Sequence, residues 1–200
     1  MSVALTEIPA RSTDEGPRLK QWTREECEVL EKAGLFDQER VELIEGELIS
    51  KMGKKQPHVN TTHRVIDWLN TVFGSAYVRY EAPIDVTPED NPRNQPEPDV
   101  MVLKRSFDEF ARAPQPQDLR LVVEIADTTL YFDLAVKAPL YARAGILDYW
   151  VFDVSGRRLI VHRDPRDGRY ASVVAYGEHE MVAPLAAPES PVRVGDLIVS

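Results

Sequence analysis

The sequence has one cysteine, no long apolar run and fewer basic than acidic residues. Cys27 cannot form an internal disulfide and has no second cysteine with which to bind zinc, so disulfide frameworks and cysteine-based zinc sites are excluded. No stretch approaches the length of a membrane span, so we expect no membrane association. The net charge of −9 argues against a protein that coats nucleic acid, because such binding needs many Lys and Arg contacts to phosphate. It does not exclude a nuclease, since a local basic cleft can coexist with an acidic remainder.

The chain is long enough for one full domain and short for two, with 200 residues of which 43% are hydrophobic. The first 17 residues are polar, carry Glu7, Asp14 and Glu15, and do not resemble a signal peptide. We therefore expect a disordered leader over residues 1–20, a single domain over residues 21–200 and a cytoplasmic location.

The first half of the domain contains several clear local signals. Thr23 and Glu26 form a capping-box pattern that predicts a helix over residues 24–32, before Gly34. Apolar runs at residues 41–44 and 47–49 flank Glu45-Gly46 and predict a hairpin. A second helix is predicted from about His58 to Gly74, followed by short strands at 77–80 and 84–86. The segment 87–98 contains four prolines, and we expect either a lid or substrate-facing segment, or a disordered loop.

The second half reads as strand, helix and strand. Strands are predicted at residues 99–103, 121–125 and 149–153, with a helix over 130–144 between the last two, and this order implies a parallel crossover. A hairpin at 159–162 and 170–175 and a late strand over 192–199 complete the chain. The fold class is therefore α/β, a mixed β-sheet flanked by helices.

Two carboxylates stand on strands that are otherwise apolar. Asp99 opens the run Val100 to Leu103, and Glu124 interrupts the run Leu121 to Ile125. Buried strands seldom carry acids without a reason. On neighbouring strands the two acids could share a hard cation such as Mg²⁺, which prefers oxygen ligands and keeps waters that a substrate can displace. The sequence thus predicts a divalent-metal phosphodiesterase site, in which a nearby lysine would stabilise the attacking hydroxide.

Asp99, Glu124 and Lys137 resemble the acid-acid-lysine core of the PD-(D/E)XK, or restriction-endonuclease-like, superfamily. The flanking words are similar to those of the Uma-two family of endonucleases, over roughly residues 22–175. Any one of these motifs alone would be weak evidence for the family, but five occur in the same order. They are VELIEGE at 41–47, PDV at 98–100, VVEI at 122–125, Asp133 followed by Lys137, and LYARAGI at 140–146 with Tyr149-Trp150.

The resemblance implies a restriction-endonuclease-like fold and a role for each matching residue. Asp99 and Glu124 would bind Mg²⁺ or Mn²⁺, and Lys137 would stabilise the nucleophile or the developing charge on phosphorus. Glu42 resembles the extra acid of these nucleases, which would hold a second metal or orient a metal-bound water; the alternative is a polar residue on an exposed strand face. The expected substrate is nucleic acid, with DNA preferred, and similar proteins commonly form homodimers.

The lysine departs from the superfamily pattern. The common position, two residues after the second acid, holds Ala126, so Lys137 would have to reach the site from the following helix. On a regular helix Asp133 would share a face with Lys137 and could orient its ammonium, although a carboxylate at a helix start is stabilising without any function. Pro139 predicts a kink, or a main helix that begins near Lys137.

Several signals remain open. Lys51, Lys54 and Lys55 are interpreted as a solvated loop first and as phosphate contacts second, and His58 as a helix-entry residue before a substrate or metal ligand. The apolar strand with Tyr149, Trp150 and Phe152 predicts a homodimer, with core burial as the competing explanation. The alternatives to a nuclease are a noncatalytic nucleic-acid or protein-binding module on the same fold and a metal-dependent hydrolase of another phosphoester.

Overall fold

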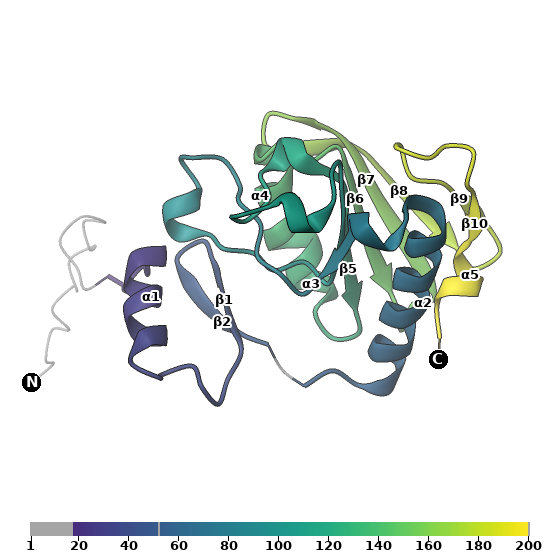
Figure 1. The fold of residues 1–200 in the computed structure, drawn as a ribbon. Helices are drawn as coiled ribbons and strands as arrows, with labels where there is room; N and C mark the ends of the chain where they lie inside the picture. The colour runs from purple at the N-terminus through teal and green to yellow at the C-terminus, as the bar shows by residue number, and fades with distance from the viewer. Residues whose placement is uncertain (1–17, 52, 200) are drawn as a thin grey trace, which may run out of the picture.

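A computed structural model describes residues 18–51 and 53–199 (Figure 1). The predicted leader, residues 1–20, therefore lies mostly outside the described residues. The elements in chain order are α1 (Arg24–Lys32), β1 (Val41–Ile44), β2 (Glu47–Ser50), α2 (Gln56–Phe73), η1 (Ser75–Tyr77), β3 (Val78–Tyr80), η2 (Asn91–Arg93), β4 (Val100–Leu103), η3 (Phe107–Glu109), η4 (Pro116–Asp118), β5 (Leu119–Ala126), α3 (Leu130–Phe132), η5 (Asp133–Lys137), α4 (Ala138–Arg143), β6 (Asp148–Asp153), β7 (Arg158–Arg166), β8 (Arg169–Gly177), β9 (Met181–Val182), β10 (Val192–Arg193) and α5 (Val194–Leu197).

A six-stranded mixed sheet forms the centre of the fold, in the order β3-β4-β5-β6-β7-β8. The β5–β6 pair is parallel and the other pairs are antiparallel. The segment from α3 to α4 connects β5 to β6, so the predicted parallel crossover and the α/β class are confirmed. No helix among residues 18–51 and 53–199 is long and apolar enough to cross a membrane.

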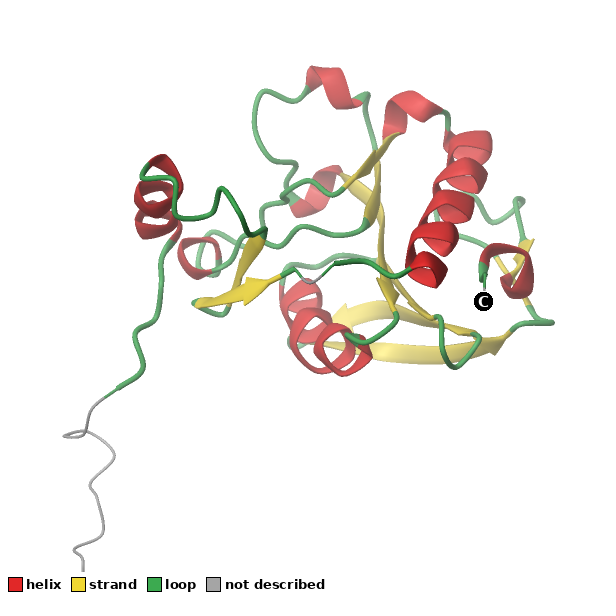
Figure 2. Ribbon diagram, turned by 90° about the horizontal axis from the view of Figure 1, so that it is seen from below, coloured by secondary structure: helices red, strands yellow, loops and turns green. Residues whose placement is uncertain are grey.

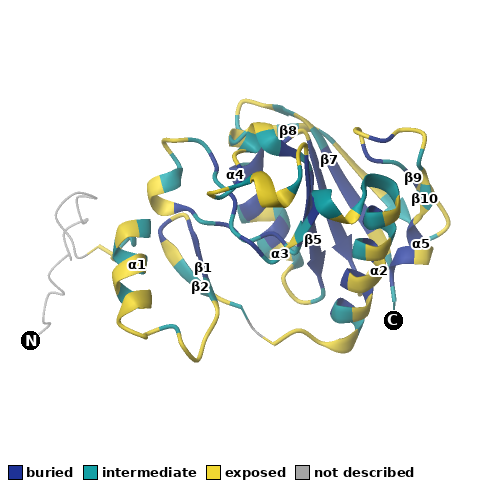
Figure 3. Ribbon diagram, viewed as in Figure 1, coloured by how far each residue is buried: buried dark blue, intermediate teal, exposed yellow. Residues whose placement is uncertain are grey.

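Helices cover both faces of this sheet (Figures 1 and 2). On one face Val65 and Leu69 of α2 and Leu197 of α5 pack against alternate residues of β5 such as Val123. On the other face Tyr141 of α4 packs against the intervening residues of β5 and β6. Because successive side chains of a strand point to opposite faces, Glu124 is directed to the α4 face. Figure 3 shows that the central strands are buried along their length.

The aromatic strand β6 belongs to this core. Tyr149, Trp150 and Phe152 are each 0% exposed, and the ring of Trp150 stacks on that of Trp68 with centroids 6.0 Å apart. Core burial, the competing explanation, therefore accounts for these aromatics. They provide no surface for a dimer.

The hairpin β1–β2 and α1 form a smaller unit beside the sheet (Figure 1). Its turn uses positive φ angles at both Glu45 and Gly46, as a tight two-residue hairpin requires. The proline-rich segment 87–98 packs on this hairpin: the amide of Gln95 donates to the carbonyl of Leu43, and buried Asn94 accepts from the amide of Glu45. The alternative of a disordered loop is therefore wrong, because the backbone of Gln95 and the side chain of Asn94 hold the segment on the hairpin.

Of the predicted strands, one is absent from the described part of the chain and another is shorter than expected. Residues 84–86 are extended and alternately buried, but the amide of Ile84 donates to Pro96 and that of Asp85 to Pro114, which are loop carbonyls rather than strand partners. The late strand is limited to β10, after which the chain turns into α5 and packs against α2. The helix over 24–32 is confirmed with both capping-box bonds, and α2 begins two residues before His58.

Candidate active site

Adjacent strands hold Asp99 and Glu124 next to each other. Asp99 lies immediately before β4, and Val100 pairs with Val123 of β5. The backbone amide of Asp99 donates to Oε2 of Glu124 at 3.3 Å, and the amide of Ile125 donates to Oδ2 of Asp99 at 2.8 Å. Each carboxylate is therefore fixed by the backbone that carries the other.

Lys137 and Glu42 join this pair. Nζ of Lys137 lies 3.0 Å from Oε1 of Glu124 and 3.0 Å from Oε1 of Glu42. The other oxygen of Glu42 accepts the amide of Glu97 at 3.2 Å. Glu42 is only 5% exposed, so the alternative of an exposed strand face is wrong. The structure thus brings all four predicted residues into one cluster, from β1, the start of β4, β5 and the crossover segment.

A π-helical turn, η5, delivers the lysine. The amide of Ala138 donates to the carbonyl of Asp133, five residues earlier, where an α-helix would use four. Pro139 has no amide hydrogen and its ring crowds the carbonyl of Ala135, which disfavours a regular helix at this point. The expected kink takes the form of this widened turn, and α4 begins at Ala138, next to Lys137.

Tyr141 is a member of the cluster that the sequence interpretation missed. Its hydroxyl donates to Oε1 of Glu124 at 3.0 Å, and burial holds the pKa of Tyr141 well above its usual range, so the hydroxyl keeps its proton. The available signal was the spacing of four residues from Lys137, which places both on one side of a helix. Asp133 is also buried, and its Oδ2 accepts from the hydroxyl of Thr129 at 2.7 Å.

The electrostatics leave negative charge in excess around Glu124. Burial raises the pKa of Glu124 to about 8; Lys137 opposes the rise, and Asp133, Asp99 and Glu42 add to it. Burial would lower the pKa of Lys137, but Glu124 and Glu42 outweigh burial and hold that pKa well above its usual range. Lys137 is therefore an ammonium group, and it is shared among more acids than it can neutralise.

The surroundings of Asp99 are different. Nζ of Lys54 lies 2.7 Å from Oδ1 of Asp99 and 2.5 Å from Oε1 of Glu81, and Nε2 of His58 lies 3.5 Å from the same Asp99 oxygen. Burial raises the pKa of Asp99, but His58 and Lys54 outweigh it and keep the pKa well below its usual range. Asp99 is therefore an ionised carboxylate. Lys54 is paired and partly buried, so the interpretation of its loop as fully solvated does not hold at this residue.

The donor set suits a hard cation that keeps part of its water shell. Asp99 and Glu124 offer carboxylate oxygens, which Mg²⁺ and Mn²⁺ prefer. Within the described residues, no three Asp, Glu, His or Cys side chains are grouped so that they could enclose a metal ion. Mg²⁺ is commonly bound through one or two carboxylates and several waters, so the pair fits this kind of ion and not a closed structural site.

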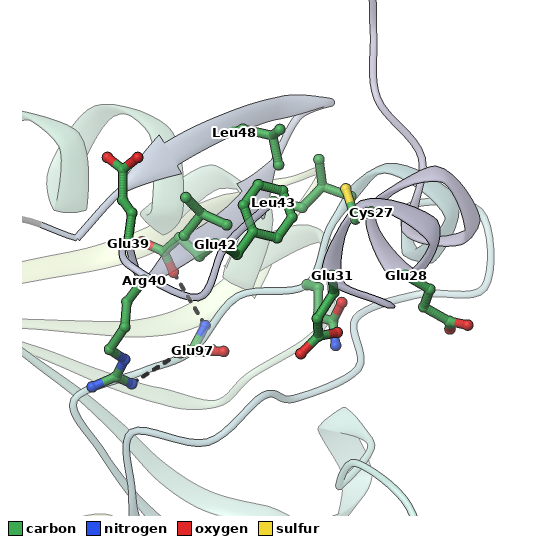
Figure 4. A pocket seen from close by; sticks show the side chains of 12 residues that line it. Cys27, Glu28, Glu31, Glu39, Arg40, Glu42, Leu43, Leu48 and Glu97 are labelled. Atoms are coloured by element: carbon green, nitrogen blue, oxygen red, sulfur yellow. Dashed lines mark hydrogen bonds and ion pairs between the residues drawn. The ribbon is translucent and has the colours of Figure 1, made fainter. Parts of the chain in front are cut away.

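A pocket of about 290 Å³ lies beyond Glu42, between α1 and the hairpin (Figure 4). Glu42 and Glu97 line its inner wall, with the hydrogen bond between them, while Cys27 and Glu31 of α1 line the outer wall. Arg40 on its rim is paired with Glu97. The many carboxylates of this lining would repel phosphate, so a substrate phosphate would have to approach from the side of Asp99.

Comparison with known proteins identifies the family. The family model Uma2, described as "Putative restriction endonuclease", matches residues 24–193. The chain belongs to the Uma2 family. The match confirms the resemblance predicted from the sequence and supports an assignment to the nucleases. No curated protein matches the sequence.

A solved structure shares the Uma2 fold. It is described as a putative nuclease belonging to DUF820 from Anabaena variabilis, is 16% identical, and superimposes with a TM-score of 0.59 over 80% of this chain and 90% of its own. At this identity the likeness shows a common fold. The predicted restriction-endonuclease-like mixed sheet is therefore confirmed at the level of the fold.

Proposed function

We propose that this Uma2 protein is a Mg²⁺- or Mn²⁺-dependent endonuclease that hydrolyses phosphodiester bonds in DNA. The observation that carries the proposal is the convergence of Asp99, Glu124 and Lys137 in one cluster, with contacts of 2.8–3.3 Å that link two strands and the crossover helix. A purely structural core would have no use for several buried acids around one lysine, since each buried charge is costly.

The residues have distinct tasks under this proposal. Asp99 and Glu124 would hold the divalent ion, which when bound supplies an activated water and neutralises charge on the phosphate. Lys137 is an ammonium with no free base form to offer, so it stabilises negative charge on the attacking oxygen or on phosphorus rather than removing a proton. Glu42, fixed by the amide of Glu97, holds Lys137 in position.

The test is a nuclease assay on supercoiled, linear and single-stranded DNA, and on RNA, with Mg²⁺ or Mn²⁺. We expect cleavage of DNA that requires the metal and is lost in Asp99→Ala. Calorimetric titration with Mn²⁺ separates an enzyme from a noncatalytic binding module on the same fold. Nucleic-acid binding without metal binding or cleavage would favour the module, and cleavage of RNA alone would correct the substrate.

We also propose that the protein is a homodimer. The evidence is the exposed edge strand β8 and not the aromatic strand β6, which is buried. β8 is an edge strand on which Val173 and Val174 are 54% and 44% exposed. If two copies of β8 paired in antiparallel fashion about Val173, Tyr170 would face Tyr176 and Ala171 would face Ala175, so the strand is nearly self-complementary. Light scattering should report a dimer that Val173→Lys disrupts. A monomer at high micromolar concentration would contradict the proposal.

The expected location is the cytoplasm, where the lone thiol of Cys27 would stay reduced and where the proposed substrate is found. Fractionation of cells that express the protein tests this expectation.

A further inference from the structure

Lys54 carries a contact that the proposed reaction does not use. Its ammonium lies 2.7 Å from Oδ1 of Asp99, one of the carboxylate oxygens assigned above to the metal, and 2.5 Å from Oε1 of Glu81. The Lys54 side chain is 29% exposed, whereas that of Lys137 is 4% exposed, so it has room to move. A cation therefore already rests on the more open acid of the pair.

A second observation lies beside the same oxygen. Nε2 of His58 is buried and has no hydrogen-bond partner among the described residues, although it lies 3.5 Å from Oδ1 of Asp99. The residue as a whole is 8% exposed. The loose approach to Asp99 leaves this buried nitrogen without a well-formed hydrogen bond, so a ligand beside it could complete its bonding.

Both side chains stand at the start of α2, a helix of 18 residues. The first turn of α2 contains no acidic residue, and its N-cap, Lys55, makes no side-chain cap bond. The amides of Gln56 and His58 in this turn add partial positive charge, because the N-terminal amides of a helix have no partner within it. Lys54 and the helix start thus form a positive region directly beside Asp99, and the ring nitrogen of His58 lies against the same Asp99 oxygen.

We propose that Lys54, His58 and the first turn of α2 form a binding site for a backbone phosphate of the nucleic acid, and that Lys54 rests on Asp99 until a divalent cation replaces it there. The inference rests on the proposed function. A divalent ion at Oδ1 and the Lys54 ammonium cannot occupy the same position, and the flexible stem of lysine lets the ammonium leave while Glu81 still attracts it.

This arrangement sets an order of events. In the metal-free protein both Asp99 and Glu81 pair with the Lys54 ammonium, so the positive region attracts phosphate weakly. When the ion takes the place at Asp99, the Lys54 ammonium keeps only Glu81, which it shares with Arg40, and can contact a phosphate next to the scissile one. Metal binding should therefore strengthen binding of nucleic acid, and by linkage nucleic acid should strengthen metal binding.

The first experiment titrates the protein with Mn²⁺ by calorimetry, without nucleic acid, and compares Lys54→Met with the control Lys51→Met. Lys51 lies in the same connection and has similar exposure, but its ammonium contacts Oε2 of Glu97 at 3.1 Å instead of Asp99. Because Lys54→Met removes the cation that competes at Asp99, it should bind Mn²⁺ roughly three- to tenfold more tightly. Lys51→Met should stay close to the parent.

The second experiment measures binding of a short labelled duplex by fluorescence anisotropy in Ca²⁺, with a gel to check that the duplex stays intact. Lys54→Met should bind the duplex roughly three- to tenfold more weakly than the parent, and the slope of log affinity against log salt should fall by about one. Without a divalent ion the two proteins should have the same slope. His58→Leu should also weaken binding in Ca²⁺, and His58→Gln, which keeps a donor, should restore part of it.

A merely structural ion pair would give a different pattern, in which Lys54→Met lowers the melting temperature and leaves or weakens Mn²⁺ affinity. If the parent binds Mn²⁺ and Lys54→Met binds it no more tightly, this inference is wrong and the proposed function stands. If the parent binds no Mn²⁺, both the proposed function and the inference about Lys54 are wrong. Lys54→Arg keeps the positive charge, so it shows whether a loss of duplex binding or of melting temperature in Lys54→Met comes from the missing charge or from misfolding.

Discussion

The cluster around Asp99 and Glu124 has a closed half and an open half, which differ in the solvent exposure of their side chains. Glu124, Lys137 and Glu42 have side chains no more than 5% exposed and form a fixed arrangement against α4. Asp99 is 14% exposed and Lys54 29%, on the side of the loop that leads into α2. The closed half can hold a charged lysine at a fixed position, while the open half can exchange ions and admit a phosphate. Under the proposed function, the closed half would stabilise charge and the open half would admit the substrate.

Loss of an acid in the open half should have the largest effect. Asp99→Ala should abolish Mn²⁺ binding and lower cleavage by about a thousandfold or more, because metal-assisted charge stabilisation contributes several kcal/mol. Single-turnover cleavage and calorimetry measure both effects. Asp127→Ala is the matched control, since this acid follows β5 closely and pairs with Lys55 outside the cluster. Equal losses of Mn²⁺ binding and cleavage in Asp127→Ala would show that the total negative charge, and not the position of Asp99, causes the effect.

Loss of the lysine in the closed half should separate binding from chemistry. Lys137→Met should lower the single-turnover cleavage rate by roughly a hundred- to a thousandfold and leave Mn²⁺ affinity within a few-fold of the parent, since the ammonium acts on the developing charge. Thermal unfolding is needed as a check, because Glu42 and Glu124 lose their partner. The exposed Lys104→Met serves as control. A variant that cleaves as fast as the parent would remove Lys137 from the site.

The two acids should also respond to pH in opposite ways when the protein is metal-free. The folded-state pKa of Glu124, about 8, lies above its ordinary value of 4.5, so the folded protein binds the extra proton and stability falls as pH rises from about 4.5 through about 8. The pKa of Asp99 is lowered, so its contribution is present above its ordinary value of 3.8 and is lost only as pH falls below it.

Denaturant unfolding in EDTA, between about pH 5 and pH 8, tests Glu124 once the parent is compared with Glu124→Gln, because burial also raises the pKa of Asp133 to about 6 and Asp133 contributes to the same loss of stability. Glu124→Gln should reduce the loss of stability over this range and be more stable than the parent at the alkaline end, by on the order of a few kcal/mol. Asp99→Asn should keep the parent's slope. A parent whose stability is flat over this range would show that Glu124 is not protonated there.

The smallest expected effect concerns the tyrosine of the closed half. Tyr141→Phe removes one hydrogen bond to Glu124 while Lys137 remains, so stability should fall by about 1 kcal/mol and cleavage by less than about tenfold. Tyr170→Phe is a matched control, because its hydroxyl donates to the carbonyl of Ile146 away from the cluster. It should cost similar stability and leave cleavage unchanged. A larger loss of cleavage in Tyr141→Phe would place its hydroxyl on the reacting groups.

The sequence predicted the parts of this site whose signal is local. Asp99 and Glu124 could be found because an acid on an otherwise apolar strand is unusual. Lys137 and Glu42 could be found because they lie in short sequence motifs that resemble those of the family. Ala126 occupies the position, two residues after Glu124 on the same strand face, where the superfamily carries its lysine. In this protein Ala126 is 1% exposed and packs in the core, so the lysine comes from another element.

The remainder depended on tertiary contacts that no local pattern encodes. Lys54 meets Asp99 across 45 residues, and neither its loop nor its spacing reveals the partner. The predicted strand at 84–86 had the correct alternation of buried residues but no strand beside it, since loop carbonyls accept its amides. The late strand failed because α5 contacts α2, which outweighs the β propensity of a valine-rich tail.

The widened turn at η5 has a consequence for how relatives of this chain are aligned and engineered. A π turn holds one residue more than an α turn, and each residue of an α-helix advances by about 100° around the axis. Deleting Val136 and letting the segment become α-helical would restore the angular position of everything that follows, so the lysine would keep its direction while standing one residue nearer to Glu124 in sequence. A relative without the π turn would then show a one-residue gap between the second acid and the lysine in an alignment, and its lysine would still point into the site.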